Sequence, residues 1–105
     1  MNVRLIIPTI DEVPVDLYRT RIAHIAGGYT AWTAIGGWIN EHHQLVEEPV
    51  TVVETSIGKD NSNAINQLRQ VAVKVCNDLD QDCVFLSFDG EAHYVLKDGS
   101  DMTPA

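Results

Sequence analysis

The chain has 105 residues, which leaves room for one domain with one hydrophobic core. Its composition, 45% apolar and 21% charged, is that of an ordinary globular protein and excludes a disordered or fibrous chain. Fifteen acidic residues against seven basic ones give a formal charge of −8. This charge argues against a nucleic-acid partner, because nucleic-acid binding depends largely on cations that neutralise phosphates. A cationic ligand, or mimicry of a nucleic acid's negative surface, fits better.

No apolar run is long enough to span a membrane, and the N-terminal segment ending at Pro8 is too short for a signal peptide. The sequence therefore predicts a cytoplasmic protein with no membrane partner. Cys76 and Cys83 lie seven residues apart in a chain without an export signal. Both are expected to be reduced structural thiols rather than a disulfide.

The first half of the chain predicts a strand, a helix and two further strands. Residues 3–7 form a β-rich apolar run that stops at Pro8 and suits a central strand. A helix follows, with Asp11, Glu12 and Asp16 near its start, Pro14 in its first turn, and its end at residues 27–28. Residues 29–38 and 49–56 predict a hairpin with a polar connector at 40–44.

The second half predicts a helix and two strands. Asn61 or Ser62 is a suitable N-cap for a helix that carries a continuous apolar stripe from Ile65 to Leu79. Residues 83–88 then form a buried strand, and Asp89 and Gly90 join it to residues 92–96 through a two-residue turn. Residues 1–97 form the predicted single domain, and residues 98–105 a short flexible tail.

This order predicts an α+β fold, a ferredoxin-like βαββαβ sandwich with an extra C-terminal strand. Both helices would cover one face of an antiparallel sheet. The opposite face would have no helix to cover it, and in a small chain such a face is usually buried by another subunit. We therefore expect a homo-oligomer.

The sequence offers little support for metal, nucleotide-phosphate or acyl-transfer chemistry. None of the four histidines stands at a metal-ligand spacing, and His42 and His43 fit solvated loop residues best. No Gly-rich phosphate loop or nucleophile elbow is present. We expect no metal and no cofactor.

Two polar clusters interrupt the apolar pattern at the expected starts of strands. Glu47 and Glu48 precede the strand at residue 49, and Gln81 and Asp82 precede the one at residue 83. In a split βαβ fold these strand starts can approach one another, directly or across a subunit boundary, and would line a pocket suited to a positive ligand. Trp38 could add an aromatic face for a sulfonium or ammonium group. The alternative is that these are solvated loop acids and a core or interface tryptophan.

The second half of the chain resembles the bacteriophage S-adenosylmethionine (SAM) lyases, long called SAM hydrolases. Residues 72–84, which include Cys76, Asn77, and the run Gln81 to Val84, look like the family's helix-to-strand junction. Upstream, Glu47 and Glu48 before residues 50–52 resemble its double-glutamate strand start. The similarity spans residues 47 to 88, and beyond them it extends to element order.

The resemblance implies a ferredoxin-like subunit in a homotrimer, with SAM bound between subunits and cleaved to methylthioadenosine and homoserine lactone. Glu48, Gln81 and Asp82 match the positions of the family's functional residues. Trp38 stands where the family has an active-site tyrosine and lacks the hydroxyl, and the loop to Glu48 is one residue shorter. Glu48 and Asp82 would orient the amino group or sulfonium, Gln81 would bind the nucleoside or tail, and Trp38, with Glu47 nearby, would contact the substrate.

The resulting hypothesis is a phage lyase that depletes the methyl donor in the host cytoplasm and so counters restriction. A rival is a non-catalytic phage oligomer that sequesters a ligand or inhibits a host protein. An acidic nucleic-acid mimic is a third reading, disfavoured because no predicted helix carries a regular acidic stripe.

Overall fold

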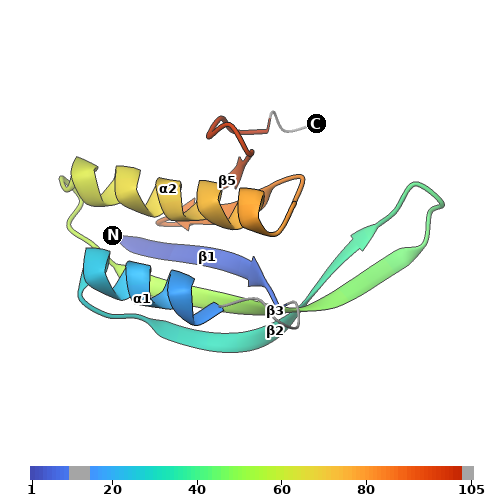
Figure 1. Cartoon of the computed structure of the whole chain (residues 1–105), viewed down its shortest axis with the longest axis horizontal. Coiled ribbons are helices and arrows are strands. Elements are labelled where there is room, and N and C mark those ends of the chain that lie inside the picture. The colour runs from blue at the N-terminus through green and yellow to red at the C-terminus, as the bar shows by residue number, and fades with distance from the viewer. Residues whose placement is uncertain (10–14, 103–105) are drawn as a thin grey trace.

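The structure, a computed structural model, describes residues 1–9 and 15–102 (Figure 1). The predicted helix-start residues Asp11, Glu12 and Pro14 lie outside the described residues. The elements follow the predicted order of strands and helices: β1 (Asn2–Pro8), α1 (Val15–Ala26), β2 (Thr30–Ile39), β3 (Leu45–Ser56), α2 (Ser62–Asp78), β4 (Val84–Phe88) and β5 (Glu91–Val95).

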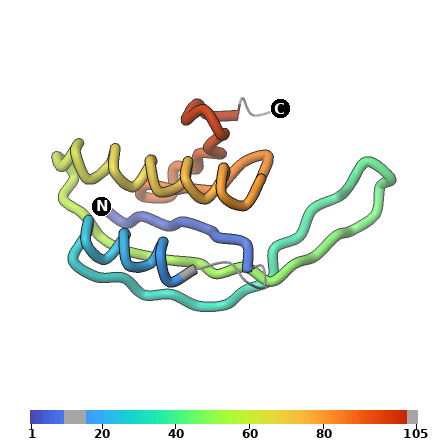
Figure 2. The backbone as a smooth tube through the Cα atoms, viewed as in Figure 1, coloured from blue at the N-terminus to red at the C-terminus, as the bar shows by residue number. Residues whose placement is uncertain are grey.

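The five strands form one antiparallel sheet in the order β2-β3-β1-β4-β5. The first four strands have the order of a split βαβ unit, consistent with a ferredoxin-like fold, and β5 extends the sheet by one hairpin. Both helices lie on the same side of the sheet (Figures 1 and 2). The predicted α+β class and the uncovered sheet face are therefore confirmed.

The core lies between the helices and the sheet because residues of each strand alternate between its two faces. On β1, Val3, Leu5 and Ile7 are buried and belong to the core cluster. From α2, the predicted apolar stripe supplies a row of fully buried side chains: Leu68, Val71, Ala72, Val75 and Cys76. Burial of this stripe stabilises the contact of α2 with the sheet.

The ends of α2 and of the β4–β5 hairpin follow the predicted local chemistry. Asn61 caps α2, its side-chain oxygen accepting a hydrogen bond from the Ala64 amide at 3.0 Å. Asp89 and Gly90 both have positive φ, as a two-residue turn of this kind requires. Cys76 and Cys83 are free thiols, as expected.

The segment after β5 folds back on the domain as far as residue 102, and this differs from the expected flexible tail. The Met102 amide donates to the Tyr94 carbonyl at 2.8 Å, and Asp101 forms an isolated bridge with Val95. The Asp101 carboxylate also pairs with Arg69 on α2 and with the His93 ring. Residues 103–105 lie outside the described part of the chain.

The β2–β3 hairpin is longer than predicted. We expected the second strand to begin at Pro49, but β3 begins at Leu45, so Glu47 and Glu48 lie within the strand rather than before it. Proline is tolerated here because the Pro49 carbonyl accepts from the Thr9 amide, on the β1 side. The Pro49 nitrogen points the same way, so its missing N–H costs no bond to β2.

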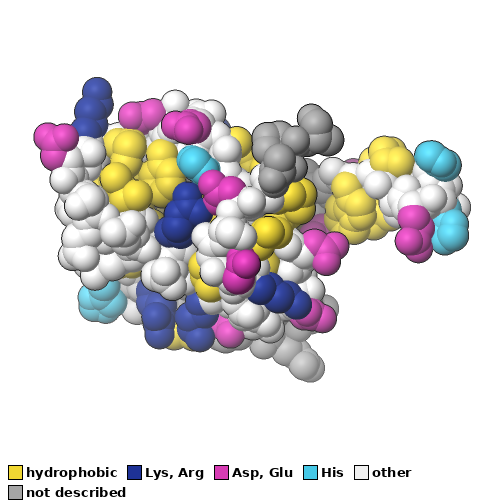
Figure 3. Space-filling view, turned by 90° about the horizontal axis from the view of Figure 1, so that it is seen from above, with side chains coloured by type: hydrophobic (Ala, Val, Ile, Leu, Met, Phe, Trp, Pro, Cys, Tyr) yellow, Lys and Arg dark blue, Asp and Glu magenta, His cyan; other side chains and the backbone are white. Residues whose placement is uncertain are grey.

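Residues 35–49, called the arm below, extend beyond the last residue of β1. Pro8 of β1 pairs with Val50, so β3 has only β2 as a neighbour further along the arm. Figure 2 shows the arm projecting from the body of the domain. Figure 3 shows hydrophobic side chains along it and histidine and acidic side chains at its tip. Ile35, Ile39 and Leu45 are each more than three-fifths exposed there.

No helix in the described part of the chain is both long and apolar enough to cross a membrane.

The contact between the two helices contains a polar link that yields a stability prediction. The buried Tyr18 of α1 donates its hydroxyl to the Asp78 carboxylate of α2 at 2.8 Å, and Lys74 also pairs with Asp78. Replacing Tyr18 by Phe should lower the free energy of unfolding by about 2 kcal/mol, since a hydrogen bond to a charged group is lost. Urea denaturation of both proteins measures this difference.

The same pair also predicts a pH dependence. Burial, and then the hydrogen bond to Asp78, raise the pKa of Tyr18 to about 12. Because this pKa is higher in the folded than in the unfolded chain, the stabilisation is complete below about pH 10 and is lost toward about pH 12. The difference in stability between wild type and Tyr18→Phe should therefore shrink over this interval. A difference that stays constant would contradict the assignment.

Candidate functional site

A hollow of about 200 Å³ lies where the arm leaves the body of the domain, and it is called the arm hollow below. It contains three of the predicted site residues, Trp38 from β2, Glu48 from β3 and Gln81 from the loop before β4. Its remaining walls come from β1, β2, β3, the loop before β4, β4 and β5: Ile6, Pro8, Gly36, Gly37, Val50, Cys83, Val84, Phe85 and Tyr94. Residues more than 30 positions apart in the chain thus meet at one place.

Strand register brings Trp38 and Glu48 to the same face of the arm. Gly36 pairs with Glu48 and Trp38 pairs with Val46, and alternate residues of each strand share a face. This face continues the side of the sheet that the helices leave uncovered. Glycine at position 36 leaves room for Val50, another lining residue, since a Cβ there would lie 3.1 Å from Val50 Cγ1.

Gln81 reaches the arm hollow because α2 ends in a tight turn. Asp80 has a φ of +49°, and its carboxylate pairs with Lys97. This reversal lets the Gln81 amide donate to the Cys76 carbonyl at 2.9 Å. The hydrogen bond to Lys97 holds the pKa of Asp80 below its usual range, so the pair is fully charged near neutral pH.

The structure does not bring Asp82 and Glu47 into the arm hollow. Asp82 lines a separate, shallow surface depression with Gln81, Leu96, Lys97 and Asp98. Glu47 is exposed on the opposite face of the arm, because neighbouring residues of a strand point to opposite sides. Of the two adjacent glutamates that the sequence places at the site, only Glu48 faces the hollow.

Among the side chains of the arm hollow that were absent from the predicted site, three carry aromatic or thiol groups. Tyr94 of β5 and Phe85 of β4 are paired in register, and their rings meet edge to face with centroids 5.7 Å apart. Cys83 completes this wall. The predicted β4–β5 hairpin could have placed Tyr94 opposite Phe85, but nothing local linked that pair to the arm.

The arm hollow combines an acidic group with aromatic walls. Glu48 is half-buried, and its carboxylate makes no ion pair or hydrogen bond within residues 1–9 and 15–102. None of the described residues that line the hollow is a lysine, arginine or histidine. A carboxylate without a cation, beside Trp38 and Tyr94, suits a positively charged ligand.

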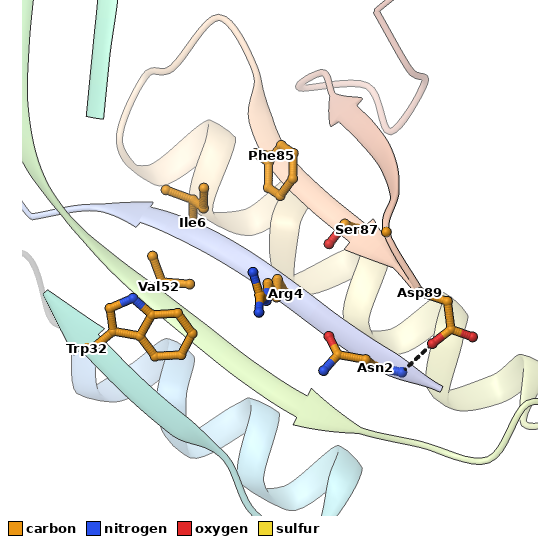
Figure 4. Close-up of a pocket in the computed structure, with 9 residues that line it drawn as sticks. Asn2, Arg4, Ile6, Trp32, Val52, Phe85, Ser87 and Asp89 are labelled. Carbon is orange, nitrogen blue, oxygen red and sulfur yellow. Dashed lines mark hydrogen bonds between the residues drawn. The ribbon is translucent and has the colours of Figure 1, made fainter. Parts of the chain in front are cut away.

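A larger hollow adjoins the first on the uncovered sheet face (Figure 4). It shares Ile6 and Phe85 with the arm hollow. Arg4 lies in it, with its guanidinium 5.8 Å from the centroid of the Trp32 ring and its Nε 2.5 Å from Glu54 Oε2. This apolar face with a few polar groups is the surface for which the sequence predicts a second subunit.

The described residues contain no group of three or more histidine, cysteine, aspartate or glutamate side chains that could hold a metal ion.

Comparison with known proteins supports the resemblance at the level of fold. A phage SAM lyase in complex with S-methyl-5′-thioadenosine superposes with a TM-score of 0.66 at 13% identity, covering 90% of this chain and 88% of that one. A phage SAM lyase in the apo state gives 0.65 at 13% identity, with 90% and 87% covered. The chain has the fold of phage SAM lyases. No protein-family model matches the sequence, and no curated protein shows significant similarity to it.

The coverage of the two SAM lyase structures extends the likeness beyond residues 47 to 88, where the sequence resemblance lies. Nine-tenths of the chain takes part in the superposition, so the likeness includes most of the elements around the arm hollow. The low identity leaves the chemistry to be argued from the residues of this chain. Trp38, Glu48 and Gln81 are the predicted site residues that line the arm hollow.

The two cysteines provide a chemical test of the arm hollow. Cys83 lines it and is partly exposed, whereas Cys76 is fully buried. Burial raises the pKa of both thiols, so alkylation by iodoacetamide should be slow near neutral pH and faster as the pH rises.

Mass spectrometry of the folded protein should find Cys83 modified first, and Cys76 modified only after denaturation. Cys83→Ser should remain unmodified while folded. Faster labelling of Cys76 than of Cys83 would contradict the described arrangement.

Proposed function

We propose that this protein is a SAM lyase that cleaves SAM to methylthioadenosine and homoserine lactone. The observation that carries the proposal is the meeting of Trp38, Glu48 and Gln81 in one hollow, on a fold shared with phage SAM lyases. One of those lyases was solved with S-methyl-5′-thioadenosine, a product of this cleavage.

The proposed reaction requires little acid–base chemistry from the protein. The substrate's own carboxylate attacks its γ-carbon and forms the lactone C–O bond. The Cγ–S bond breaks, and its electron pair returns to sulfur to give a neutral thioether. No water, base or oxidant is consumed. Holding the amino-acid tail folded and keeping water out supply the acceleration.

Each group of the arm hollow has a role in this reaction. Glu48 attracts the positive end of the substrate, and Trp38 lies against the sulfonium. Apolar side chains, among them Ile6 and Phe85, exclude water from the reacting atoms.

Trp38 lacks the hydroxyl of the tyrosine at the corresponding family position. Tyr94, on the opposite wall, provides a phenol hydroxyl in the same hollow. Asp82 and Glu47 stay outside it.

A second copy of the chain would complete the site. The arm hollow, at about 200 Å³, is smaller than the pockets that enclose most small ligands, about 300–1,000 Å³, and it opens onto the apolar uncovered sheet face. A homotrimer with its uncovered faces turned inward would bury that face and enclose the ligand between subunits. The proposed setting is the host cytoplasm, where loss of the methyl donor would counter restriction.

A non-catalytic role in ligand sequestration is the second candidate. The absence of a hydroxyl on Trp38 favours it, since binding needs the aromatic face alone. Such a protein would retain SAM without producing methylthioadenosine.

Incubation with SAM tests the proposed activity. Chromatography should reveal methylthioadenosine and homoserine lactone in equal amounts. Glu48→Gln should lower the rate by about a hundredfold, because the substrate is no longer held in its reactive geometry. Glu41→Gln at the arm tip, an equivalent change outside the hollow, is the matched control and should retain the wild-type rate.

Each outcome of this assay has a distinct meaning. Intact SAM together with a raised melting temperature in its presence would support sequestration instead of cleavage. Intact SAM without a thermal shift would reject both candidates. A full rate in Glu48→Gln would remove Glu48 from the site.

Light scattering coupled to gel filtration tests the proposed trimer. Trp32 on the uncovered face and Leu17 on α1 are equally exposed, at 41% each. Wild type and Leu17→Glu should have the mass of three chains. Trp32→Glu should have the mass of one chain, because a carboxylate would be buried in the interface. A wild type with the mass of one chain at micromolar concentration would exclude the trimer.

A further inference from the structure

The Gln81 side chain is held in one orientation by the main chain of its own turn. Its Nε2 donates to the Leu79 carbonyl at 2.9 Å. The reverse orientation would bring Oε1 against that carbonyl, and two acceptors cannot share a hydrogen bond. The nitrogen is therefore committed to the turn. The amide retains a free Oε1, an acceptor with two lone pairs, and a single remaining N–H.

Two bonds from the end of α2 fix the main chain of Gln81 in the same way. The Gln81 amide donates to the Cys76 carbonyl at 2.9 Å, and the Cys76 thiol donates to the Gln81 carbonyl with Sγ and oxygen 3.2 Å apart. Cys76 is fully buried in the core. These bonds connect Gln81 to the buried core through Cys76. Fixing a binding group before the ligand arrives lowers the entropic cost of binding.

The second acceptor of the hollow is Glu48. Its carboxylate can only accept hydrogen bonds, and it has no partner within residues 1–9 and 15–102. Gln81 and Glu48 both line the arm hollow, where the described residues include no cation, and two such acceptors fit a ligand group that is positive and carries several N–H donors. A primary ammonium meets this description. A sulfonium carries no N–H and would rely on the aromatic faces alone.

We propose that Gln81 Oε1 and the Glu48 carboxylate together bind the ammonium group of the ligand's amino-acid portion, with Cys76 as a positioning residue for Gln81. For the identity of the ligand this rests on the proposed function. It assigns Gln81 to the amino-acid end of SAM and away from the nucleoside, and it makes a free amino group a requirement for tight binding.

Two nucleoside probes separate these ends of the ligand. S-adenosylhomocysteine carries the ammonium and cannot be cleaved through a sulfonium, whereas methylthioadenosine lacks the amino-acid portion. In calorimetric titrations, Gln81→Met should weaken binding of S-adenosylhomocysteine by about tenfold to a hundredfold, the cost of losing a hydrogen bond to a charged group. Binding of methylthioadenosine should change by less than about twofold. Gln70→Met, an exposed change on α2, is the matched control.

Cys76 is tested by rescue. Cys76→Ala removes the thiol donor and should weaken binding of S-adenosylhomocysteine severalfold, while Cys76→Ser retains a donor and should restore it. Thermal unfolding of both variants measures how much stability is lost to the small cavity that alanine leaves in the core. Equal binding by the alanine and serine variants would overturn the positioning role of Cys76.

Failure of this assignment can be distinguished from failure of the proposed function. Equal weakening of both probes by Gln81→Met would place Gln81 at the nucleoside, and unchanged binding of both would remove it from the site. Either result overturns the ammonium assignment and leaves the lyase proposal standing. A wild type that binds neither probe and leaves SAM intact overturns the proposed function itself.

Discussion

Strand β1 has to satisfy two apolar surfaces at once. Val3, Leu5 and Ile7 pack beneath the helices, whereas Arg4 and Ile6 belong to the uncovered face. The strand is paired on both sides, with β3 and with β4, so a slip of one residue would exchange its two faces and break the core. The register of the whole sheet, and with it the face on which Glu48 and Phe85 lie, depends on this alternation.

The length of β1 has a second consequence, because the site lies where this strand stops. Beyond Pro8 the β2–β3 hairpin continues without a third strand, and the sheet changes there from five strands to two. Ile6 and Pro8 form the edge of that step, and the arm hollow opens beside them. A longer β1 would pair with the arm and fill the hollow, so a strand that ends early creates room for a ligand.

The parts of the fold that local chemistry determines could be predicted from the sequence. The apolar stripe of α2, the Asn61 cap and the turn at Asp89 and Gly90 each need only nearby residues, and all three are confirmed. The start of β3 could not be predicted in this way. Pro49 was predicted to begin the strand because proline lacks the N–H that the interior of a strand uses. Its nitrogen faces β1 rather than β2, and that direction depends on pairing with a strand distant in sequence.

The candidate site divides in the same way between local and distant causes. The sequence indicated Trp38, Glu48 and Gln81, and the structure brings them together in the arm hollow. The sequence also placed Glu47 and Asp82 at the site, and neither lines the hollow. Strand alternation puts Glu47 on the opposite face, and the reversal at Asp80 brings Gln81 rather than Asp82 to the hollow. Tyr94 was missed because it reaches the arm hollow only through the order of strands in the sheet.

The acidic character of the chain acquires a specific meaning in the proposed chemistry. The substrate's carboxylate must act as a nucleophile, and an arginine or lysine paired with it would lower its reactivity. The described residues that line the arm hollow include neither. An acceptor-only pair formed by Glu48 and Gln81 can hold the substrate by its ammonium and leave the carboxylate free. As the bond forms, a carboxylate and a sulfonium become two uncharged groups, and loss of charge is favoured by apolar surroundings. Apolar walls, with no cationic side chain among the described lining residues, therefore favour the less charged transition state of the cleavage over the zwitterionic tail of the bound substrate.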